Sequence, residues 1–284
     1  MTMYIYLNGE LLPKEEAKIS PFDHGFLYGM GLFETIRTYG GKPFLLEEHI
    51  ERLQAGMQEM NIAMTLTVEK AGKIIAALCE KNQLPHSSVR LNISAGEGAM
   101  GPQTETFHHP AIFAFQRPVV PSFEMKEKEA VLLQLRRNTP ETGFRLKSHH
   151  YFNNIAAKRE VGSDPAKEGI FLTKEGYVAE GVASNIFWVK AGTLFTPALD
   201  TGILNGVTRM FLLKRAQAMQ IPVQEGLFRL KELLSADEIF LTNSIQEIAP
   251  VHLIGGKCFP GRNGEITKQL YEDYRSWTGQ TAFL

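Results

Sequence analysis

A lysine, and a glutamate that follows it along the chain, are the residues whose types and surroundings most suggest catalysis. Lys147 lies in residues 145–150 (RLKSHH), and Glu180 lies in a turn of small residues, 179–185 (AEGVASN). A lysine amine can form an imine with an aldehyde. A carboxylate can keep a pyridine nitrogen protonated, so that the ring draws electrons from a carbanion. Most lysines and glutamates are solvated surface groups, but together these two suggest an enzyme that uses pyridoxal 5′-phosphate.

A glycine-containing loop before a helix is the best candidate for binding the phosphate of such a cofactor. Residues 201–209 (TGILNGVTR) precede a helix predicted over 210–219. Gly206 allows the backbone to approach an anion closely. The amide groups of Val207 and Thr208 at the helix start, with the Thr208 hydroxyl, would then donate to the phosphate. The alternative is an ordinary loop that leads into a helix.

Two other segments carry donors for a phosphate. Residues 242–244 (TNS) follow a predicted strand, where polar side chains are well placed to face a ligand; a capping turn is the alternative. Arg52, near the start of a predicted helix, can offer a fork of donors to a phosphate. Its alternative is a solvated arginine paired with Glu48.

Composition and charge indicate a soluble globular protein. The 284 residues are 44% hydrophobic and 21% charged, with a net charge of -1, which argues against a nucleic-acid partner. The two cysteines, Cys79 and Cys258, fit neither a zinc pattern nor a disulfide framework. The N-terminus turns polar too early for a signal peptide, and no apolar run is long enough to span a membrane. We expect a cytoplasmic protein that uses no metal and contacts no membrane.

The pattern of elements predicts an α/β or α+β protein, without a doubly wound sheet. Hydrophobic periodicity and turn signals define the elements. Strands are predicted over residues 4–8, 10–12, 32–39, 43–45, 89–94, 111–115, 130–135, 169–173, 177–180, 185–190 and 238–242. Helices are predicted over residues 47–60, 68–78, 151–160, 210–219 and 267–277.

A proline-containing segment divides the chain. Residues 116–122 (QRPVVPS) contain two prolines, which limit helix and sheet and are typical of extended linkers. We therefore expect a small α+β N-terminal domain over residues 1–116, a linker over 117–122 and a larger cofactor-binding domain over 123–284.

Six markers, in order along nearly the whole chain, resemble the class IV aminotransferases, which are pyridoxal-phosphate enzymes of fold type IV. That family includes branched-chain aminotransferases, D-amino acid aminotransferases and 4-amino-4-deoxychorismate lyases. The markers are FETIR (33–37), EHIERL (48–53), KS (147–148), EG with SN (180–181, 184–185), GILNGVTR (202–209), and NS with Glu247 and Pro250 (243–244).

The resemblance implies roles for these residues. Lys147 would hold the cofactor and shuttle protons, and Glu180 would bind the pyridine nitrogen. The expected phosphate and cofactor contacts are Arg52, Val207, Thr208, Asn243 and Ser244. The implied fold is a small α+β domain and a larger, barrel-like domain with the cofactor between them. Family members are usually homodimers whose active site borrows from the other subunit.

Within the family, three features favour a lyase that converts 4-amino-4-deoxychorismate to 4-aminobenzoate and pyruvate, in the folate route. Asn243 and Arg90 resemble residues of the lyases, and Arg90 suits a small-molecule substrate with two carboxylates. Residues 137–154 also resemble bacillus-type lyases. We expect Arg90 and Asn243 to bind substrate. The alternatives are a D-amino acid or branched-chain aminotransferase, and a non-catalytic binding protein.

The roles of five further residues stay open. His149 and His150 would contact a substrate carboxylate or the lysine, or else form local hydrogen bonds near a helix start. Arg145 would serve the second carboxylate or pair with a neighbouring acid. Phe33 and Tyr28 are expected in the apolar core rather than in a substrate pocket.

Overall fold

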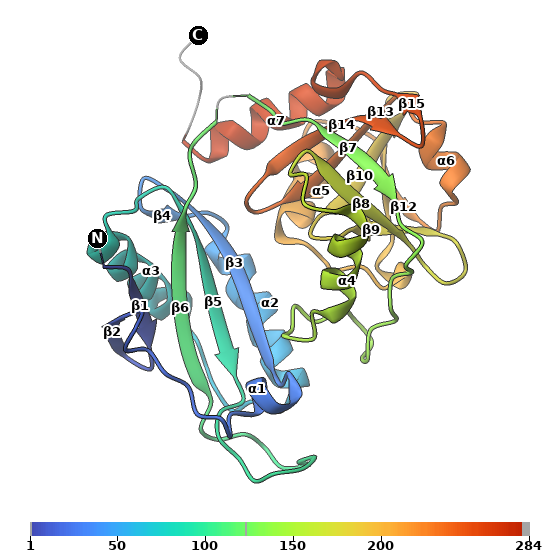
Figure 1. The fold of residues 1–284 in the computed structure, drawn as a ribbon. Coiled ribbons are helices and arrows are strands. Elements are labelled where there is room, and N and C mark those ends of the chain that lie inside the picture. The colour runs from blue at the N-terminus through green and yellow to red at the C-terminus, as the bar shows by residue number, and fades with distance from the viewer. Residues whose placement is uncertain (1, 123, 280–284) are drawn as a thin grey trace. The chain divides into compact units, whose positions relative to one another are not determined.

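The computed structural model describes residues 2–122 and 124–279, which form the predicted mixture of helices and strands (Figure 1). The chain divides into two compact units. Unit 1 comprises the chain up to Pro121 together with Leu146–His150, and unit 2 comprises Ser122–Arg145 and the chain from Tyr151 onward. The catalytic-lysine candidate therefore belongs to unit 1, although the residues on both sides of its segment belong to unit 2.

Unit 1 is built on a six-stranded antiparallel sheet with the order β2-β1-β6-β5-β3-β4. Its strands are β1 (Tyr4–Leu7), β2 (Glu10–Pro13), β3 (Gly31–Tyr39), β4 (Lys42–Pro43), β5 (Ser87–Ser94) and β6 (Ala111–Pro118). Its helices are α1 (His24–Tyr28), α2 (Leu46–Glu59) and α3 (Val68–Asn82).

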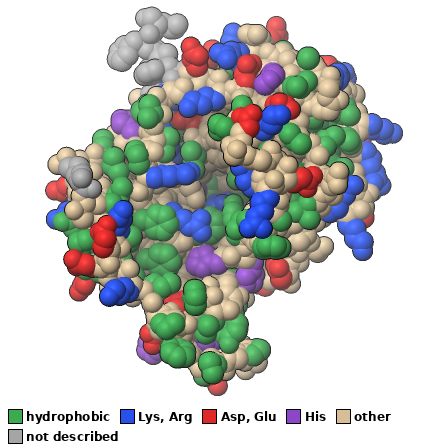
Figure 2. Space-filling view, viewed as in Figure 1, with side chains coloured by type: hydrophobic (Ala, Val, Ile, Leu, Met, Phe, Trp, Pro, Cys, Tyr) green, Lys and Arg blue, Asp and Glu red, His purple; other side chains and the backbone are tan. Residues whose placement is uncertain are grey.

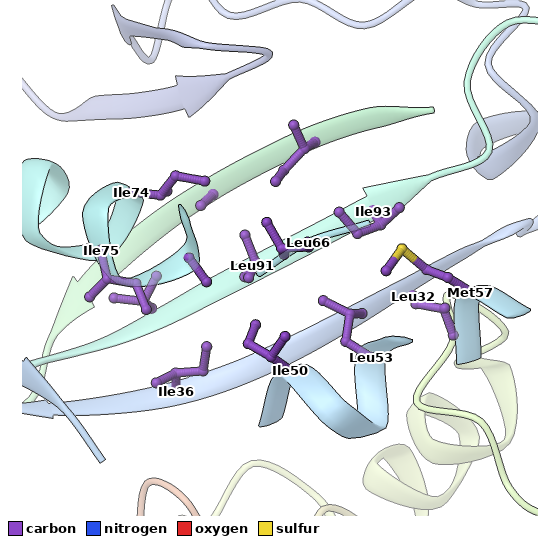
Figure 3. Packing of buried hydrophobic residues seen from close by; sticks show 14 of the residues in the cluster. Leu32, Ile36, Ile50, Leu53, Met57, Leu66, Ile74, Ile75, Leu91 and Ile93 are labelled. Atoms are coloured by element: carbon purple, nitrogen blue, oxygen red, sulfur yellow. The ribbon is translucent and has the colours of Figure 1, made fainter. Parts of the chain in front are cut away.

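The core of unit 1 lies between this sheet and helices α2 and α3 (Figure 3). Alternate residues of β3 and β5, such as Leu32 and Leu91, face the helices because successive side chains of a strand point to opposite sides. Ile50 and Met57 of α2 pack against them. The same alternation turns the residues between them, including Phe33, to the other face of the sheet.

Unit 2 contains a nine-stranded mixed sheet with the order β12-β11-β10-β13-β14-β7-β8-β9, with β15 paired to β14. The sheet is curled: Phe195 of β11 and Val178 of β9, far apart in the strand order, pack against one core. This confirms the expected barrel-like domain. The strands are β7 (Lys128–Leu132), β8 (Lys167–Leu172), β9 (Val178–Gly181), β10 (Asn185–Lys190), β11 (Thr193–Pro197), β12 (Val223–Gly226), β13 (Glu238–Asn243), β14 (Glu247–Ile254) and β15 (Lys257–Cys258).

The last helix of unit 2 is fixed by charged side chains at both ends. The carboxylate of Glu238 accepts hydrogen bonds from the Ile266 and Thr267 amides at 3.1 and 2.8 Å, and Arg275 pairs with the buried Glu247 at 3.1 Å. The helices of unit 2 are α4 (Phe152–Val161), α5 (Val207–Ala218), α6 (Leu230–Leu234) and α7 (Glu265–Trp277), with 3-10 turns at η1 (Leu199–Thr201) and η2 (Gly261–Asn263).

The predicted elements differ from the structure mainly where periodicity is short. The strand expected over 43–45 ends at Pro43, because Leu45 adopts a left-handed conformation (φ 54°) that starts α2. The expected linker begins inside β6, whose pairing with β5 continues to Pro118. Six elements had no counterpart in the prediction: α1, α6, β11, β12, β14 and β15.

The surface carries both signs of charge. Figure 2 shows Lys and Arg side chains interspersed with Asp and Glu over the visible face, in keeping with the net charge of -1. In the described part of the chain, none of the helices combines the length and the apolar character that a membrane crossing requires.

Replacing Glu238 by alanine should destabilise the protein, because it removes the acceptor for the amides at the start of α7. We expect Glu238→Ala to lower the free energy of unfolding by about 1–3 kcal/mol, and Glu238→Gln to lower it less. Urea unfolding followed by circular dichroism measures the change. Glu265→Gln, an exposed acid in the same helical turn, is the control, and an equal loss in the control would contradict the assignment.

Candidate functional site

Lys147 is positioned by backbone pairing with strand β3. The Phe33 amide donates to the Lys147 carbonyl at 2.9 Å, and the His149 amide donates to the Gly31 carbonyl at 2.9 Å. Leu32 and Ser148 form an antiparallel bridge between these two bonds. Residues 146–150 therefore act as an added strand at the edge of the unit 1 sheet, which fixes the lysine backbone.

Two cationic side chains lie over the Phe33 ring. The Lys147 Nζ lies 4.7 Å from the ring centroid, and the Arg90 guanidinium carbon lies 3.5 Å from it. Arg90 also donates through Nε to Asn92 Oδ1 at 3.0 Å. Phe33 is buried as expected. Because it lies on the sheet face away from the helices, it joins the lysine and Arg90 in one local cluster.

The histidines after the lysine have different surroundings. The His149 ring stacks on Phe33 at a centroid distance of 6.4 Å. Burial, and then the positive charge of Arg90, lower the pKa of His149 to about 4. A Cβ on Gly31 would lie only 2.4 Å from the His149 Nδ1, so this close approach requires glycine. The neutral imidazole of His149 thus belongs to the Lys147 cluster.

The His150 ring contacts a residue far away in the sequence, so its contact is not the local one that was expected as the alternative. Its Nε2 lies 3.1 Å from the Tyr28 carbonyl oxygen. The expectation that Tyr28 lies in the apolar core is wrong, because its side chain is 42% exposed. Its hydroxyl accepts a hydrogen bond from the Gly101 amide at 2.7 Å, which ties α1 to the loop after β5.

A buried carboxylate holds Arg52. Glu34 of β3 accepts from the Arg52 Nε at 2.8 Å and from its Nη2 at 2.6 Å, and the His49 Nδ1 lies 2.6 Å from the same carboxylate. The alternative of a solvated arginine paired with Glu48 is therefore wrong. Arg52 is a mostly buried member of a cluster of three residues, Glu34, His49 and Arg52, that joins α2 to β3.

The charge of this cluster is well defined. Burial alone would raise the pKa of Glu34, but the charge of Arg52 and the hydrogen bonds with His49 and Arg52 outweigh it and lower the pKa to about 2. Burial lowers the pKa of His49, and the Glu34 carboxylate opposes this only in part. Near neutral pH the cluster therefore consists of a carboxylate, a guanidinium and a neutral imidazole.

Glu180 is the corresponding buried carboxylate of unit 2. It accepts from the Arg137 Nε at 2.8 Å and from the Leu204 amide at 3.0 Å, and the Arg145 Nε lies at 3.8 Å. Arg145 therefore has an acidic neighbour within its own unit, as one of its two alternatives expected, and its substrate role stays a prediction. Burial, and then repulsion by Arg137, lower the pKa of Arg145 to about 10, so it stays charged at neutral pH.

Asn185 connects Glu180 to the predicted phosphate-binding loop. Its Nδ2 donates to the Leu204 carbonyl at 2.8 Å and lies 3.4 Å from the Glu180 Oε2. A Cβ on Gly206 would lie 2.0 Å from the Asn185 Oδ1, so glycine is required there by close approach. Glu180 and the start of α5 therefore form one connected site.

Helix α5 begins at Val207, three residues before the helix predicted over 210–219, and leaves amide donors at its start. Its N-cap, Gly206, provides no side-chain cap, and the Met210 amide is the one that donates to the Gly206 carbonyl. The amides of Val207 and Thr208 come before that bond, where a helix has no backbone acceptor of its own. This donor set suits an anion such as a phosphate.

The end of strand β13 supplies a further polar group near this site. The Thr242 hydroxyl is buried and has no hydrogen-bond partner among the described residues, and Thr242 pairs with Asn185 across the sheet. Asn243 has a structural role, since its Nδ2 donates to the Ala183 carbonyl and its Oδ1 accepts from the Ile245 and Gln246 amides. Its binding role, like that of Ser244, stays a prediction.

The structure brings the predicted residues together in two groups, one within each unit. Unit 1 holds Lys147, Arg90 and Arg52, and unit 2 holds Glu180 with the start of α5 and the end of β13. Sequence reasoning gave no role to three residues that organise these groups. Two of them, Glu34 and Asn185, stand inside the markers FETIR and SN, and the third is Arg137.

Because folding lowers the pKa of Glu34, the protein should lose stability in acid through this residue. The unfolded carboxylate, with an ordinary pKa of 4.5, takes up a proton as the pH falls, whereas the folded one stays ionised down to about pH 2. Between about pH 5 and 3, wild type should lose about 2 kcal/mol more unfolding free energy than Glu34→Gln. Urea unfolding at each pH tests this, and parallel losses would refute it.

Comparisons with known proteins place the chain in one family. The family model for amino-transferase class IV matches residues 31–254. The aminodeoxychorismate lyase of Bacillus subtilis (strain 168) is 45% identical over 273 residues, which cover 95% of this chain and 93% of that protein. The D-alanine aminotransferase of Listeria monocytogenes serotype 1/2a is 30% identical, covering 95% of this chain and 94% of that protein.

A solved structure agrees with this placement. The T.th. branched-chain amino acid aminotransferase with pyridoxamine 5′-phosphate has a TM-score of 0.89 and 26% identity, covering 99% of this chain and 95% of that one. The predicted family, fold type and cofactor are thereby confirmed. The chain belongs to the class IV aminotransferases, a family of enzymes that use pyridoxal 5′-phosphate.

Proposed function

We propose that this enzyme is a lyase that converts 4-amino-4-deoxychorismate to 4-aminobenzoate and pyruvate, in the folate route. The observation that carries the proposal is the 45% identity to the Bacillus subtilis aminodeoxychorismate lyase along almost the full length of both chains. The D-alanine aminotransferase shares only 30%. That second similarity keeps an aminotransferase as the rival activity.

The residues of both units fit the cofactor. We propose that Glu180 contacts the pyridine nitrogen, and that the Val207 and Thr208 amides, with Ser244 and Arg52, hold the phosphate. Two features support this assignment: the glycine N-cap of α5 offers its amides no side-chain acceptor, and the buried Thr242 hydroxyl lacks a partner among the described residues. Glu180 is suited to its role because Arg137 and the Leu204 amide hold its carboxylate in place.

Chain continuity links the two groups of residues. Only Leu146 separates Lys147 from Arg145, and Arg145 lies beside Glu180. We propose, as the family resemblance implies, that Lys147 and Glu180 act on one bound cofactor.

Lys147 is the proposed base. When bound, pyridoxal 5′-phosphate supplies an aldehyde carbon for amines and a ring that draws electrons from the reacting bond. The Lys147 Nζ then takes the proton from the substrate C4 as the bond from C3 to the enolpyruvyl oxygen breaks. The departing enolpyruvate gains a proton at carbon to become pyruvate, and formation of the aromatic ring drives the elimination.

Arg90 is the proposed partner for a substrate carboxylate. Its guanidinium lies on the same Phe33 ring as the Lys147 Nζ, so an anion bound by Arg90 would be close to the base. The bond from Arg90 to Asn92 restricts the guanidinium further. The homodimer implied by the resemblance and the cytoplasmic location expected from the composition remain predictions.

A turnover assay separates the two activities. With 4-amino-4-deoxychorismate and no added keto acid, the enzyme should release pyruvate and 4-aminobenzoate in equal amounts. Lys147→Ala should lose this turnover almost completely because it lacks both the cofactor attachment and the base. Both products can be followed by chromatography. Rapid amino transfer from leucine or D-alanine without any lyase turnover would overturn the proposal in favour of an aminotransferase.

Arg90→Gln should raise the KM of the lyase reaction by roughly 10-fold or more, because a charge-assisted hydrogen bond to the substrate is lost. Its affinity for the cofactor, measured by equilibrium dialysis, should stay close to that of wild type. Arg117→Gln, an exposed arginine of β6 in the same sheet, is the matched control. An unchanged KM in Arg90→Gln would remove Arg90 from the substrate site.

A further inference from the structure

The Glu34 carboxylate controls how the Arg52 guanidinium can point. The carboxylate accepts from the Arg52 Nε and Nη2 in a two-pronged pair, which fixes the plane of the guanidinium as well as its position. This pair engages one edge of a planar group that carries five N–H donors in all. The edge of the guanidinium that carries Nη1 is therefore directed away from Glu34.

The pair also lies next to the lysine attachment. Glu34 follows Phe33 in β3, and the Phe33 amide is the one that binds the Lys147 carbonyl. The charge of Lys147 is close enough to contribute to lowering the pKa of His49. Within unit 1, the charge of Lys147 therefore acts on the cluster that holds Arg52.

His49 completes the support of the carboxylate. It contacts the Glu34 Oε2, and it is as deeply buried as Glu34 itself. As a neutral imidazole it adds a hydrogen bond without a second positive charge. The net charge of Glu34, His49 and Arg52 is therefore zero, so within this cluster a bound phosphate would be recognised by the direction of the Arg52 donors rather than by excess positive charge.

We propose that Glu34 is a positioning residue for the phosphate of the cofactor: it fixes the plane of the Arg52 guanidinium, so that the arginine meets that phosphate in one orientation. The proposal rests on the phosphate-binding role proposed for Arg52. An arginine without this carboxylate keeps its charge but can adopt many side-chain conformations, so it binds an anion less well.

The test compares two ligands that differ only in the phosphate. Equilibrium dialysis of the apoenzyme gives the Kd for pyridoxal 5′-phosphate and for pyridoxal. The Kd for pyridoxal divided by the Kd for pyridoxal 5′-phosphate measures recognition of the phosphate, and this ratio falls when recognition is lost. Glu34→Gln should weaken pyridoxal 5′-phosphate binding by roughly 10-fold and leave pyridoxal binding unchanged. General damage to the fold would weaken both ligands, so the ratio separates positioning from structural loss.

Three variants complete the design. Arg52→Gln should reduce the ratio at least as much as Glu34→Gln. Glu51→Gln, an exposed acid beside Arg52 in α2, leaves the pair between Glu34 and Arg52 intact and should keep the ratio. If circular dichroism shows that Glu34→Gln does not fold, then Glu34→Asp replaces it. This variant keeps the charge but shortens the side chain, and it should also reduce the ratio.

The outcomes distinguish this inference from the proposed function. An unchanged ratio in the Glu34 variant, together with a reduced ratio in Arg52→Gln, overturns the role of Glu34 alone. An unchanged ratio in Arg52→Gln overturns the role of Arg52 as well. Because binding is measured without turnover, the result does not depend on whether the enzyme is a lyase or an aminotransferase.

Discussion

Two backbone hydrogen bonds between residues 147–149 and strand β3 determine where the lysine can act. The residues before and after this segment belong to unit 2, but the two hydrogen bonds make the segment itself an edge strand of unit 1. The lysine backbone is thereby fixed by a six-stranded sheet. A reactive amine needs such a fixed position to approach its target atom in the right geometry. Phe33, Arg90 and His149 gather around it because the same sheet carries them.

The chemistry also depends on carboxylates that are buried but never left alone. Glu34 is held by Arg52 and His49, and Glu180 is held by Arg137 and the Leu204 amide. A buried charge without such partners would cost several kcal/mol. Each arginine therefore has two effects: it makes burial of the acid tolerable, and it fixes the direction in which the acid points.

The sequence was sufficient to predict elements with a long, regular pattern and the residues that carry recognisable chemistry. The helices over 47–60 and 68–78 correspond to α2 and α3, and the start of α5 was found from its glycine-containing loop. Short elements such as α1 and β12 have too few residues for a periodic signal. Tyr28 was misplaced because an aromatic residue in a five-residue helix gives no indication of which side is covered.

The partners of the charged residues were beyond sequence reasoning for a different reason. Arg52 lies on helix α2 and binds Glu34 on strand β3, and Glu180 binds Arg137, which is 43 positions away in the chain. Spacing along the chain does not report such pairs, because they arise only when the sheet has formed. The markers pointed to the correct segments, but they could not show which of their residues face each other.

The path of the chain has a consequence for the independence of the two units. The backbone passes from unit 1 to unit 2 after Pro121, returns at Leu146 and leaves again after His150. A fragment that stops at Pro121 would lack the short segment that covers the edge of β3 near Phe33. Its uncovered amide and carbonyl groups would offer a template for pairing with other chains, so the N-terminal half is poorly suited to exist as a separate soluble module.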